Sequence, residues 1–305
     1  MESTEKKSFR SGFVALVGRP NVGKSTLLNK LIGQQISITA DKPQTTRNNV
    51  RGILTKEEYQ AILLDTPGIH LPRNELHKRI VSYATRSIQE TDLVFFITEP
   101  FGPNHQTIHK GDVGIMEYLS DRAKQSILVI NKIDQSQPEY ILKTISVFNQ
   151  TLPFLETVPI SALTGKGVDI LEGFFKRYLP LGVPYFDEDQ VTDTPERVIA
   201  SEFIREQIMR HCFQEIPYGV AVVVDTFKEE KDRITIYATI YVEKESHKSI
   251  IIGKQGSMLK KIGKLSRSKI ERLLGAHLYL SLHVKLSKNW INNPGKLTEF
   301  GYSEV

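Results

Sequence analysis

Short apolar runs alternate with helix-like segments along the first 180 residues. Most of these runs are continuous, which is typical of strands buried on both faces of a parallel sheet. Two of them are separated only by Thr55–Glu58, so we expect this pair to form an antiparallel hairpin. The pattern predicts an α/β fold with a mostly parallel six-stranded sheet flanked by helices. The predicted strands are Phe13–Val17, Val50–Leu54, Tyr59–Leu64, Leu93–Ile97, Ile127–Ile130 and Glu156–Ile160.

The pattern changes after Leu179, where prolines, glycines and an acidic triplet predict a linker. A second, smaller α+β domain then begins with a helix, for which Thr194 is the predicted N-cap and Pro195 the first helical residue. The expected divisions are a tail at 1–10, a first domain at 11–180, a linker at 181–194 and a second domain at 195–305. The second domain's predicted elements are a helix to about Cys212, strands Val220–Thr226 and Ile234–Glu243, a helix Ser257–Leu274 and a strand His277–Leu286.

The composition of the chain indicates the cellular compartment of the protein. The chain has 305 residues and a net charge of +5. Its single cysteine, Cys212, cannot form an intramolecular disulfide, which suits a reducing cytosol. The first ten residues are polar and show no secretory signal, and no apolar run is long enough to span a bilayer. We therefore expect a cytoplasmic protein.

A glycine-rich loop follows the first predicted strand. Residues 18–25, Gly-Arg-Pro-Asn-Val-Gly-Lys-Ser, fit the pattern Gly-x4-Gly-Lys-Ser/Thr. Between a strand and a helix, such a loop directs backbone N–H groups at phosphates, while Lys24 reaches the outer phosphates and Ser25 ligates Mg²⁺. The alternative is a glycine-rich turn with an exposed lysine, which the strand–helix context disfavours. The predicted phosphate-binding residues are Gly18, Arg19, Pro20, Asn21, Val22, Gly23, Lys24, Ser25 and Thr26.

A second motif, Asp65-Thr66-Pro67-Gly68, closes the third predicted strand. There Asp65 can hold Mg²⁺ through a water molecule, and the Gly68 N–H can approach a γ-phosphate. In isolation, a β-turn containing proline and glycine is the alternative. The next residue is Ile69, where the Ras-like pattern has the glutamine that orients the attacking water. An apolar side chain cannot do this, so we expect hydrolysis to be slow or to use other groups.

Two further segments predict which base is bound. Residues 131–134, Asn-Lys-Ile-Asp, follow the fifth predicted strand. Asp134 can accept hydrogen bonds from the N1–H and 2-amino groups of guanine, whereas adenine would leave the carboxylate unpaired. Lys132 is expected to pack its stem along the base, and Asn131 to brace the loop. After the next strand, the backbone of residues 161–163 can reach the guanine O6. The predicted base-binding residues are Asn131, Lys132, Ile133, Asp134, Ser161, Ala162 and Leu163.

The second half contains Gly-Lys-Gln-Gly at 253–256, a Gly-x-x-Gly sequence like the loop with which KH domains clamp single-stranded nucleic acid. The pattern is weak, because residues 111–114 also fit it. However, the 253–256 match precedes a strongly basic predicted helix, whose cations and N-terminus suit a phosphate backbone. A solvated basic helix face is the alternative. The predicted RNA-binding residues are Ile252, Gly253, Lys254, Gln255, Gly256, Lys260, Lys261 and Lys264.

The order of the nucleotide motifs resembles that of the translation-factor-related GTPases. In this resemblance, residues 44–47, Gln-Thr-Thr-Arg, are similar to the first switch. Thr46 is the expected Mg²⁺ ligand in the GTP state, and Thr45 is the alternative. A resemblance to potassium-activated GTPases implies that Asn21 helps to hold K⁺ near the phosphates. The predicted catalytic residues are Lys24, Thr46 and Gly68, and the predicted Mg²⁺ ligands are Ser25, Thr46 and Asp65.

Nearly the whole chain resembles the Era family. The helix–strand–strand–helix–strand order of the second half is similar to a type II KH domain, and residues 185–210 and the tail around Trp290 and Tyr302 resemble Era proteins. The resemblance implies a switch that uses GTP/GDP and Mg²⁺ and binds the 3′ end region of 16S ribosomal RNA through its KH domain. It also implies a role in 30S ribosomal subunit assembly and a peripheral association with the inner membrane. We expect the protein to be a monomer.

Two other functions stay open from the sequence. An RNA-modifying enzyme with a GTPase appendage requires a second catalytic constellation in residues 195–305, where the four histidines show no metal-like or nucleophile-like spacing. A protein scaffold with a degenerate KH fold predicts no loss of RNA binding when Gly253 and Gly256 are replaced.

Overall fold

The computed structural model describes residues 9–302 except 41, 43–44, 48–49, 70–71, 73, 213–215 and 232. These residues form two compact units. The first unit comprises the described residues of 1–35, 46–70 and 81–193, and the second comprises those of 36–45, 71–80 and 194–305. Within this described part of the chain, no helix is both long and apolar enough to cross a membrane.

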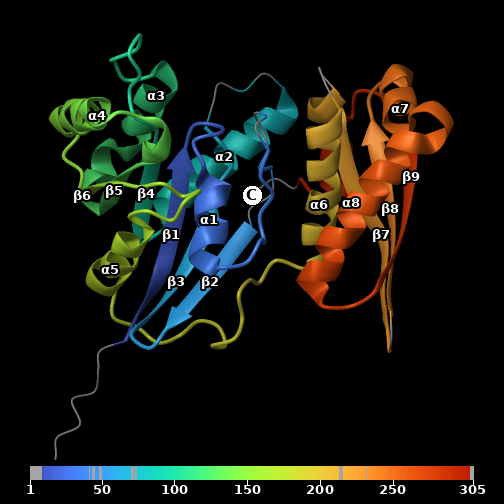
Figure 1. Cartoon of the computed structure of the whole chain (residues 1–305), viewed down its shortest axis with the longest axis horizontal. Coiled ribbons are helices and arrows are strands. Elements are labelled where there is room, and N and C mark those ends of the chain that lie inside the picture. Colours follow the sequence, from blue (N-terminus) through green and yellow to red (C-terminus); the bar gives the residue numbers. More distant parts are fainter. Residues whose placement is uncertain are drawn as a thin grey trace, which may run out of the picture. The chain divides into compact units, whose positions relative to one another are not determined.

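The first unit contains a six-stranded sheet (Figure 1). Its strands are β1 (Arg10–Gly18), β2 (Val50–Lys56), β3 (Tyr59–Asp65), β4 (Leu93–Thr98), β5 (Ser126–Ile130) and β6 (Glu156–Pro159). Its helices are α1 (Lys24–Ile32), α2 (Glu75–Glu90, whose first residues belong to the second unit), α3 (Lys110–Leu119), α4 (Pro138–Thr151) and α5 (Val168–Tyr178), with short 3₁₀ helices η1 (Ser120–Gln125) and η2 (Ile133–Gln135).

The strand order in this sheet is β2-β3-β1-β4-β5-β6. All neighbours are parallel except β2 and β3, which pair antiparallel with Lys56 opposite Tyr59. The predicted hairpin and the predicted mostly parallel sheet are therefore confirmed.

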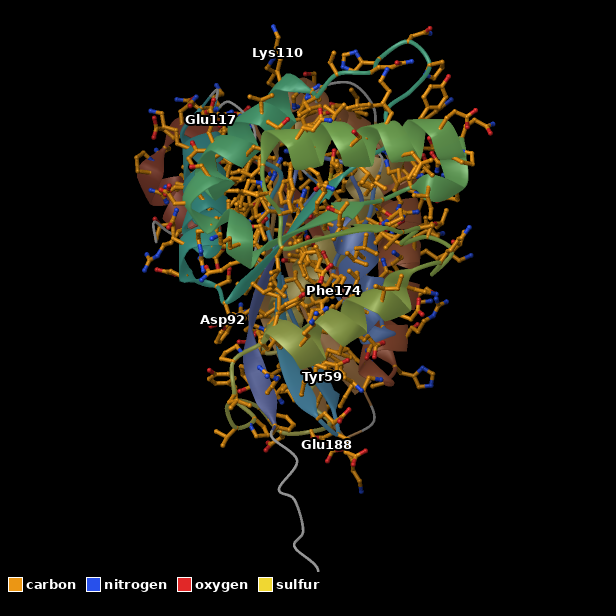
Figure 2. The ribbon with its side chains drawn as sticks, turned by 90° about the vertical axis from the view of Figure 1, so that its left-hand side faces the viewer. Tyr59, Asp92, Lys110, Glu117, Phe174 and Glu188 are labelled. Atoms are coloured by element: carbon orange, nitrogen blue, oxygen red, sulfur yellow. The ribbon has the colours of Figure 1, made fainter. Side chains whose placement is uncertain are left out.

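Two adjacent residues of β4 show why the strands have continuous apolar sequences. Phe95 stacks on Phe175 of α5, with ring centroids 5.5 Å apart, whereas Phe96 contacts Phe148 of α4 at 6.0 Å. Successive side chains of a strand point to opposite faces, so helices must cover the sheet on both sides. Figure 2 shows the face that α5 crosses. All six residues of β4 are accordingly buried.

The predicted linker is hydrogen-bonded to the β2–β3 hairpin of the first unit. The buried Gln60 side chain accepts hydrogen bonds from the N–H groups of Tyr185 at 2.7 Å and Phe186 at 3.0 Å. The Ile53 N–H of β2 donates to the carbonyl of Val191 at 2.8 Å. These bonds satisfy polar groups along the edge of the sheet.

The second unit contains a three-stranded sheet in the order β7-β8-β9, in which β7 and β8 are antiparallel and β8 and β9 are parallel. With its helices this is the predicted KH arrangement. The elements, mostly orange in Figure 1, are α6 (Glu196–His211), η3 (Ile216–Gly219), β7 (Val220–Glu230), β8 (Arg233–Val242), α7 (Glu245–Ile252), η4 (Lys254–Gly256), α8 (Ser257–Leu274), β9 (Leu278–Leu286), η5 (Trp290–Asn292) and α9 (Pro294–Glu299).

Some predicted ends of elements are wrong. Helix α6 begins at Glu196, and Pro195 is its N-cap: φ −55° suits a helix, but ψ 137° keeps this residue extended, so Thr194 is not the cap. The predicted strand ends Ile160, Glu243 and His277 each fall one residue outside the observed strands. Strand ends depend on where the partner strand stops, which local sequence does not specify.

Both faces of the second unit's sheet are covered. Residues of α6 and α8, among them Phe203 and Ile262, form one apolar core with the inward side chains of the strands. On the other face, Trp290 packs with Phe300 at a centroid distance of 5.5 Å, and its indole N–H donates to the Gly219 carbonyl at 3.2 Å. The aromatic tail noted in the sequence therefore completes the core of this unit.

Candidate functional site

The glycine-rich loop connects β1 to α1. Gly23 has φ +99°, a conformation that favours glycine, and a Cβ there would lie 2.3 Å from Asn131 Nδ2. A Cβ on Gly18 would lie 2.3 Å from a carbonyl oxygen of β4. Lys24 Nζ donates to the carbonyls of Gly18 at 3.0 Å and Arg19 at 2.8 Å. The loop thus folds around the lysine ammonium, which is the geometry expected of a phosphate cradle.

Burial controls the charge of Lys24. Loss of hydration lowers its pKa from 10.5 to about 8, and the Arg19 cation acts in the same direction, while the carboxylates of Asp65 and Asp112 oppose the shift. A phosphate bound in the loop would stabilise the charged form. Nucleotide binding and protonation of Lys24 are therefore linked.

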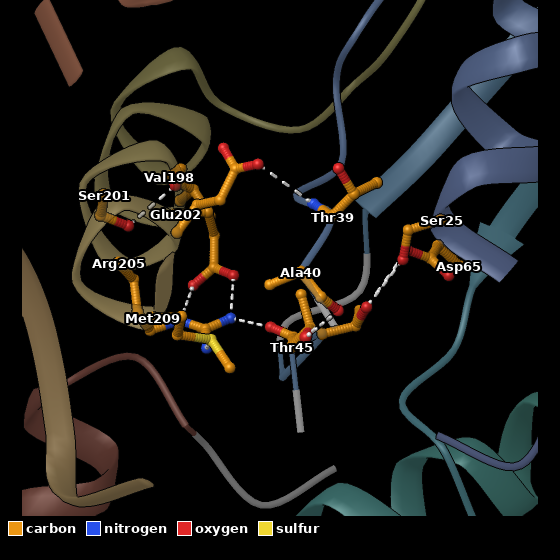
Figure 3. A network of polar contacts seen from close by, with 12 residues as sticks. Ser25, Thr39, Ala40, Thr45, Asp65, Val198, Ser201, Glu202, Arg205 and Met209 are labelled. Carbon is orange, nitrogen blue, oxygen red and sulfur yellow. Dashed lines mark hydrogen bonds and ion pairs between the residues drawn. The ribbon is translucent and has the colours of Figure 1, made fainter. Parts of the chain in front are cut away.

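Three side-chain oxygens converge beside this loop, and two of their residues, Ser25 and Asp65, are labelled in Figure 3. Ser25 Oγ lies 2.6 Å from Asp65 Oδ2 and 2.9 Å from Thr46 Oγ1, and Thr46 Oγ1 lies 3.5 Å from the same carboxylate oxygen. Asp65 and Thr46 are buried. Hydroxyl and carboxylate oxygens are the ligands that Mg²⁺ prefers, so the three predicted metal-binding residues fit this ion.

The two neighbouring threonines differ in their contacts. The Thr45 hydroxyl donates to two backbone carbonyls of its own segment at 2.6 and 3.2 Å, and the Thr45 carbonyl accepts a hydrogen bond from Arg205 within the second unit. Thr46 instead belongs to the oxygen cluster of the first unit. This geometry favours Thr46 as the metal ligand. Gln44, the first residue of the predicted switch, lies outside the described residues.

The segment after β3 packs against the phosphate loop. Thr66 Oγ1 donates to the Leu16 carbonyl at 2.7 Å. Gly68 lies so close to Pro20 that a Cβ would be 2.6 Å from its nitrogen. Ile69 is only 7% exposed and packs in the core of the first unit. It is therefore not placed to orient a water molecule, and its side chain serves packing.

Asn131 joins the loops that the sequence assigned to phosphate and base. Its Nδ2 donates to the Val22 carbonyl at 2.8 Å, and its Oδ1 accepts the Ala162 N–H at 2.8 Å. Lys132 has φ +66°, and Asp134 is exposed. The bracing role predicted for Asn131 is present in the structure, and the Asp134 carboxylate is accessible to a base.

The other predicted base-binding residues differ in how far their side chains are buried. Ser161 is buried, and its Oγ accepts the Thr164 N–H at 3.1 Å. Leu163 is 71% exposed, so its side chain makes little contact within the protein. Ile133 begins η2. The prediction that the backbone of residues 161–163 reaches the base therefore does not depend on the Leu163 side chain.

Two acidic residues beside the site were not predicted. Asp112 accepts a hydrogen bond from Arg19 Nε at 2.9 Å, and Glu99 forms ion pairs with Arg19 and Lys132. Neither belongs to a nucleotide-binding motif of the sequence. Glu99 directly follows β4, and an acid at the carboxyl end of a parallel strand is the one sequence signal that could have indicated it.

The Gly-x-x-Gly loop joins α7 to α8 in the second unit. Gly253, Gln255 and Gly256 have φ values of +73°, +51° and +76°. A Cβ on Gly253 would lie 2.8 Å from Met258 N, whereas a Cβ on Gly256 would meet nothing within 4 Å. Gly253 is therefore required for both conformation and space, and Gly256 for conformation alone.

A groove beside this loop is bounded by α8 and β9. Its cations lie four and three residues apart on α8, which places them on one helix face. One of them, Arg267, was not among the predicted RNA-binding residues, although its spacing from Lys264 could have indicated it. Residues that line this groove include Gly256, Lys260, Lys264, Arg267, Leu280 and Leu282.

Other basic residues of α8 do not line this groove. Lys269 pairs with Glu206 of α6 at 2.6 Å and lies 5.5 Å from the centre of the Phe203 ring. Lys261 lies close enough to His211 at the end of α6 to help lower its pKa, after loss of hydration. In the part of the chain that the structure describes, no group of three His, Cys, Asp or Glu side chains is arranged to hold a metal ion.

Comparison with known families agrees with this architecture. The family model described as 50S ribosome-binding GTPase matches residues 13–132, and the KH domain model matches residues 215–291. The chain is therefore a P-loop GTPase followed by a KH domain.

Relatives that are similar over nearly the full length of the chain identify the family of GTPases to which it belongs. GTPase Era of Clostridium botulinum (strain Eklund 17B / Type B) is 46% identical over 297 residues, covering 97% of this chain and 99% of the relative. GTPase Era of Geotalea uraniireducens (strain Rf4) is 48% identical over 299 residues, with the same coverage. The chain belongs to the Era GTPase family.

Two solved Era structures are similar in fold. One is described as Era in complex with MgGDPNP and nucleotides 1506–1542 of 16S ribosomal RNA; it is 39% identical, with a TM-score of 0.91, and the match covers 97% of this chain and 99% of that one. The other is a single-substitution variant of Aquifex aeolicus Era bound to GDP.AlF4-, 38% identical, with a TM-score of 0.90 and coverage of 97% and 100%.

Proposed function

We propose that this GTPase is a nucleotide-controlled RNA-binding factor that recognises the 3′ end region of 16S ribosomal RNA through its KH domain and assists 30S subunit assembly. The observation that carries the proposal is that one chain combines a guanine-nucleotide site with a basic Gly-x-x-Gly groove. The similarity to the Era structure described with MgGDPNP and 16S ribosomal RNA supports this assignment.

The nucleotide site divides the work among a few residues. Lys24 contacts the outer phosphates, the Gly68 N–H approaches the γ-phosphate, and Asp134 accepts hydrogen bonds from guanine. Ser25, Thr46 and Asp65 would hold Mg²⁺, which neutralises charge on the phosphates when it is bound. The reaction is attack of water on the γ-phosphate, which yields GDP and phosphate.

The covalent chain connects the nucleotide site to the RNA-binding unit, so a change at the bound nucleotide can affect that unit. The described residues of 36–45 and 71–80 pack within the second unit, while the described residues of the intervening 46–69 belong to the first. Thr46 is thus joined by one peptide bond to a segment that packs with the KH domain. We infer that γ-phosphate contacts order residues 44–47 and 65–72, and that the GTP-bound state is the one that binds RNA.

The same proposal includes a location. Cytoplasmic action follows from a ribosomal RNA partner, and peripheral association with the inner membrane rests on the family resemblance alone. A monomer suffices, since each chain carries both sites.

Crosslinking in cells, followed by sequencing of the bound RNA, tests the partner. We expect reads to concentrate at the 3′ end of 16S ribosomal RNA. Enrichment of another RNA would contradict the proposed partner, and absence of any RNA would favour the scaffold alternative.

Binding of a 16S 3′-end oligonucleotide to the purified protein tests the switch and the clamp. We expect tighter binding with a non-hydrolysable GTP analogue than with GDP, and equal affinities would exclude the switch. Gly256→Asp should weaken RNA binding more than about tenfold, because the loop conformation favours glycine. Gly114→Asp, in the other Gly-x-x-Gly match and with nothing within 4 Å of a Cβ, is the matched control.

A further inference from the structure

Arg19, in the phosphate loop, is held by acidic residues from outside that loop. Its Nε donates to Asp112 Oδ2 at 2.9 Å, and its Nη2 lies 3.8 Å from Glu99 Oε2. Asp112 lies in the first turn of α3, is 1% exposed, and accepts a second hydrogen bond from Thr98 at 3.0 Å. Burial raises the pKa of Asp112, but the Arg19 guanidinium and these hydrogen bonds favour its charged form. The Arg19 side chain therefore has a fixed anchor.

Glu99 connects this arginine to the loop assigned to the base. The other oxygen of the Glu99 carboxylate pairs with Lys132 Nζ. Glu99 directly follows β4, and β4 lies between β1 and β5 in the sheet. The phosphate loop follows β1 and the base loop follows β5, so a side chain placed after β4 stands between them. One carboxylate thus bridges a cation from each loop.

This bridge differs from the contact made by Asn131. Asn131 binds backbone groups of neighbouring loops, whereas Glu99 fixes the directions of two long, flexible cationic side chains. Lysine and arginine lose much rotamer freedom when they are ordered. If they are ordered before the nucleotide arrives, binding does not have to supply that free energy.

We propose that Glu99 is a positioning residue for guanine-nucleotide binding, which holds Lys132 along the base and Arg19 beside the phosphate loop. The proposal rests on the nucleotide site proposed above. Removing the Glu99 charge has two opposing effects. The site becomes more positive, which by itself strengthens the attraction for phosphates. The bridge is also lost, which frees Lys132 and leaves Arg19 held by Asp112 alone, and the proposal requires this second effect to be the larger.

The test is the dissociation rate of the fluorescent nucleotide mant-GDP from the full chain carrying Glu99→Gln, a neutral residue of equal size. We expect dissociation about fivefold faster than from the unsubstituted protein. We also expect a similar rise in KM for GTP, with kcat changed less than about twofold, because the contact is made in the ground state as well as in the transition state. Simple electrostatics predicts the opposite, slower dissociation.

Two further variants keep the test decisive. Glu90→Gln removes the same charge from the Arg86–Glu90 ion pair of α2, at 2.6 Å, and should release mant-GDP at the unsubstituted rate. Glu99→Asp keeps the charge but is too short to reach both cations, so it should also accelerate release. It replaces Glu99→Gln if circular dichroism shows that the latter does not fold.

The proposed pathway through Lys132 is tested by combining substitutions. In a Lys132→Gln background, Glu99→Gln should cause little further acceleration, because the contact with Lys132 is already lost and Arg19 keeps its hydrogen bond to Asp112. Unchanged or slower dissociation from both Glu99 variants overturns the proposal, as does full additivity with Lys132→Gln. If the unsubstituted protein fails to bind mant-GDP at all, the nucleotide site itself is contradicted, which is a separate outcome.

Discussion

The Ser25 hydroxyl donates a 2.6 Å hydrogen bond to the Asp65 carboxylate, across 40 positions of sequence. Ser25 lies in the first turn of α1 and Asp65 ends β3, so the helix start and the strand end meet at one point. Thr46 Oγ1 joins them from a third segment, at 2.9 Å from Ser25 Oγ. This convergence is the structural basis for the proposed Mg²⁺ site.

Replacement of Asp65 tests that site. Asp65→Asn keeps the size but removes the negative charge, so we expect the gain in nucleotide affinity that Mg²⁺ provides to fall by about 10- to 100-fold. Titration of mant-GDP with Mg²⁺ and with EDTA measures this gain. Asp169→Asn, which alters an exposed acid on α5, is the control. An undiminished Mg²⁺ effect in the Asp65 variant would remove Asp65 from the metal site.

Base selection depends on Asp134 in our proposal. Asp134→Asn offers an amide in place of the carboxylate. Its oxygen can still accept the N1–H, but its N–H2 group meets the 2-amino group of guanine donor to donor, whereas it can donate to the 2-oxo group of xanthine. We expect affinity for GDP to fall at least about 100-fold and that for XDP to rise. Competition binding with both nucleotides measures the change. Glu139→Gln, which alters an exposed acid in the first turn of α4, is the control and should keep the preference for GDP over XDP. An Asp134 variant that also kept this preference would show that other residues recognise the base.

The lowered pKa of Lys24 predicts proton uptake on binding. With a pKa of about 8, roughly one tenth of the side chain is neutral at pH 7 and roughly three quarters at pH 8.5. Bound phosphate raises this pKa, so GDP binding should take up about 0.1 proton at pH 7 and about 0.75 at pH 8.5, and affinity should decline above about pH 8. Calorimetry in buffers of different ionisation enthalpy gives the number of protons. Equal uptake at both pH values would contradict the linkage.

The same pKa has the opposite effect on the free protein. Between pH 8 and 10.5 the unfolded chain keeps the Lys24 proton and the folded chain loses it. Stability of the nucleotide-free protein should therefore gain from this group as the pH rises through that range.

The positions of lysines on α8 predict unequal effects on RNA binding. Lys264 lines the groove, whereas Lys261 does not. We expect Lys264→Gln to weaken RNA binding several-fold and to reduce the slope of log K against log salt by about 1, since one phosphate contact is lost. Lys261→Gln should stay within about twofold of the unsubstituted protein. Equal losses for both would mean that general charge, rather than the groove, binds RNA.

Asn21 predicts a dependence on monovalent cations. It lies exposed in the phosphate loop with φ +67°, and its resemblance to the asparagine of potassium-activated GTPases implies a K⁺ ligand. We expect GTP hydrolysis to be faster in K⁺ than in Na⁺ buffer, and Asn21→Ala to abolish the difference. Phosphate release measured in both buffers decides this, and equal rates for the unsubstituted protein would exclude a role for K⁺.

Much of the fold and site could be predicted from local sequence. The loop at 18–25 has glycines where the backbone takes special conformations or passes close to a neighbour, and it ends with Lys24 and Ser25. All the residues expected to contact the phosphates and Mg²⁺ in this motif therefore lie within eight consecutive positions. The continuous apolar runs likewise indicated buried parallel strands, because burial on both faces leaves no polar positions. The end of a helix or strand was less predictable: Pro195 suits the first helical position by its φ angle, yet its ψ makes it the cap.

The sequence by itself determined the motifs for phosphate, guanine and RNA, because each depends on residues close together in the chain. Only the tertiary structure distinguished Thr46 from Thr45, Lys264 from Lys261, and Glu99 from other surface acids. Those distinctions depend on which distant segments meet: Thr46 on Ser25 and Asp65, Lys264 on β9, and Glu99 on cations that follow β1 and β5. The type of a residue and its neighbours in the sequence determine which interactions it can make. The packing of strands and helices that are distant in sequence determines which partner it contacts.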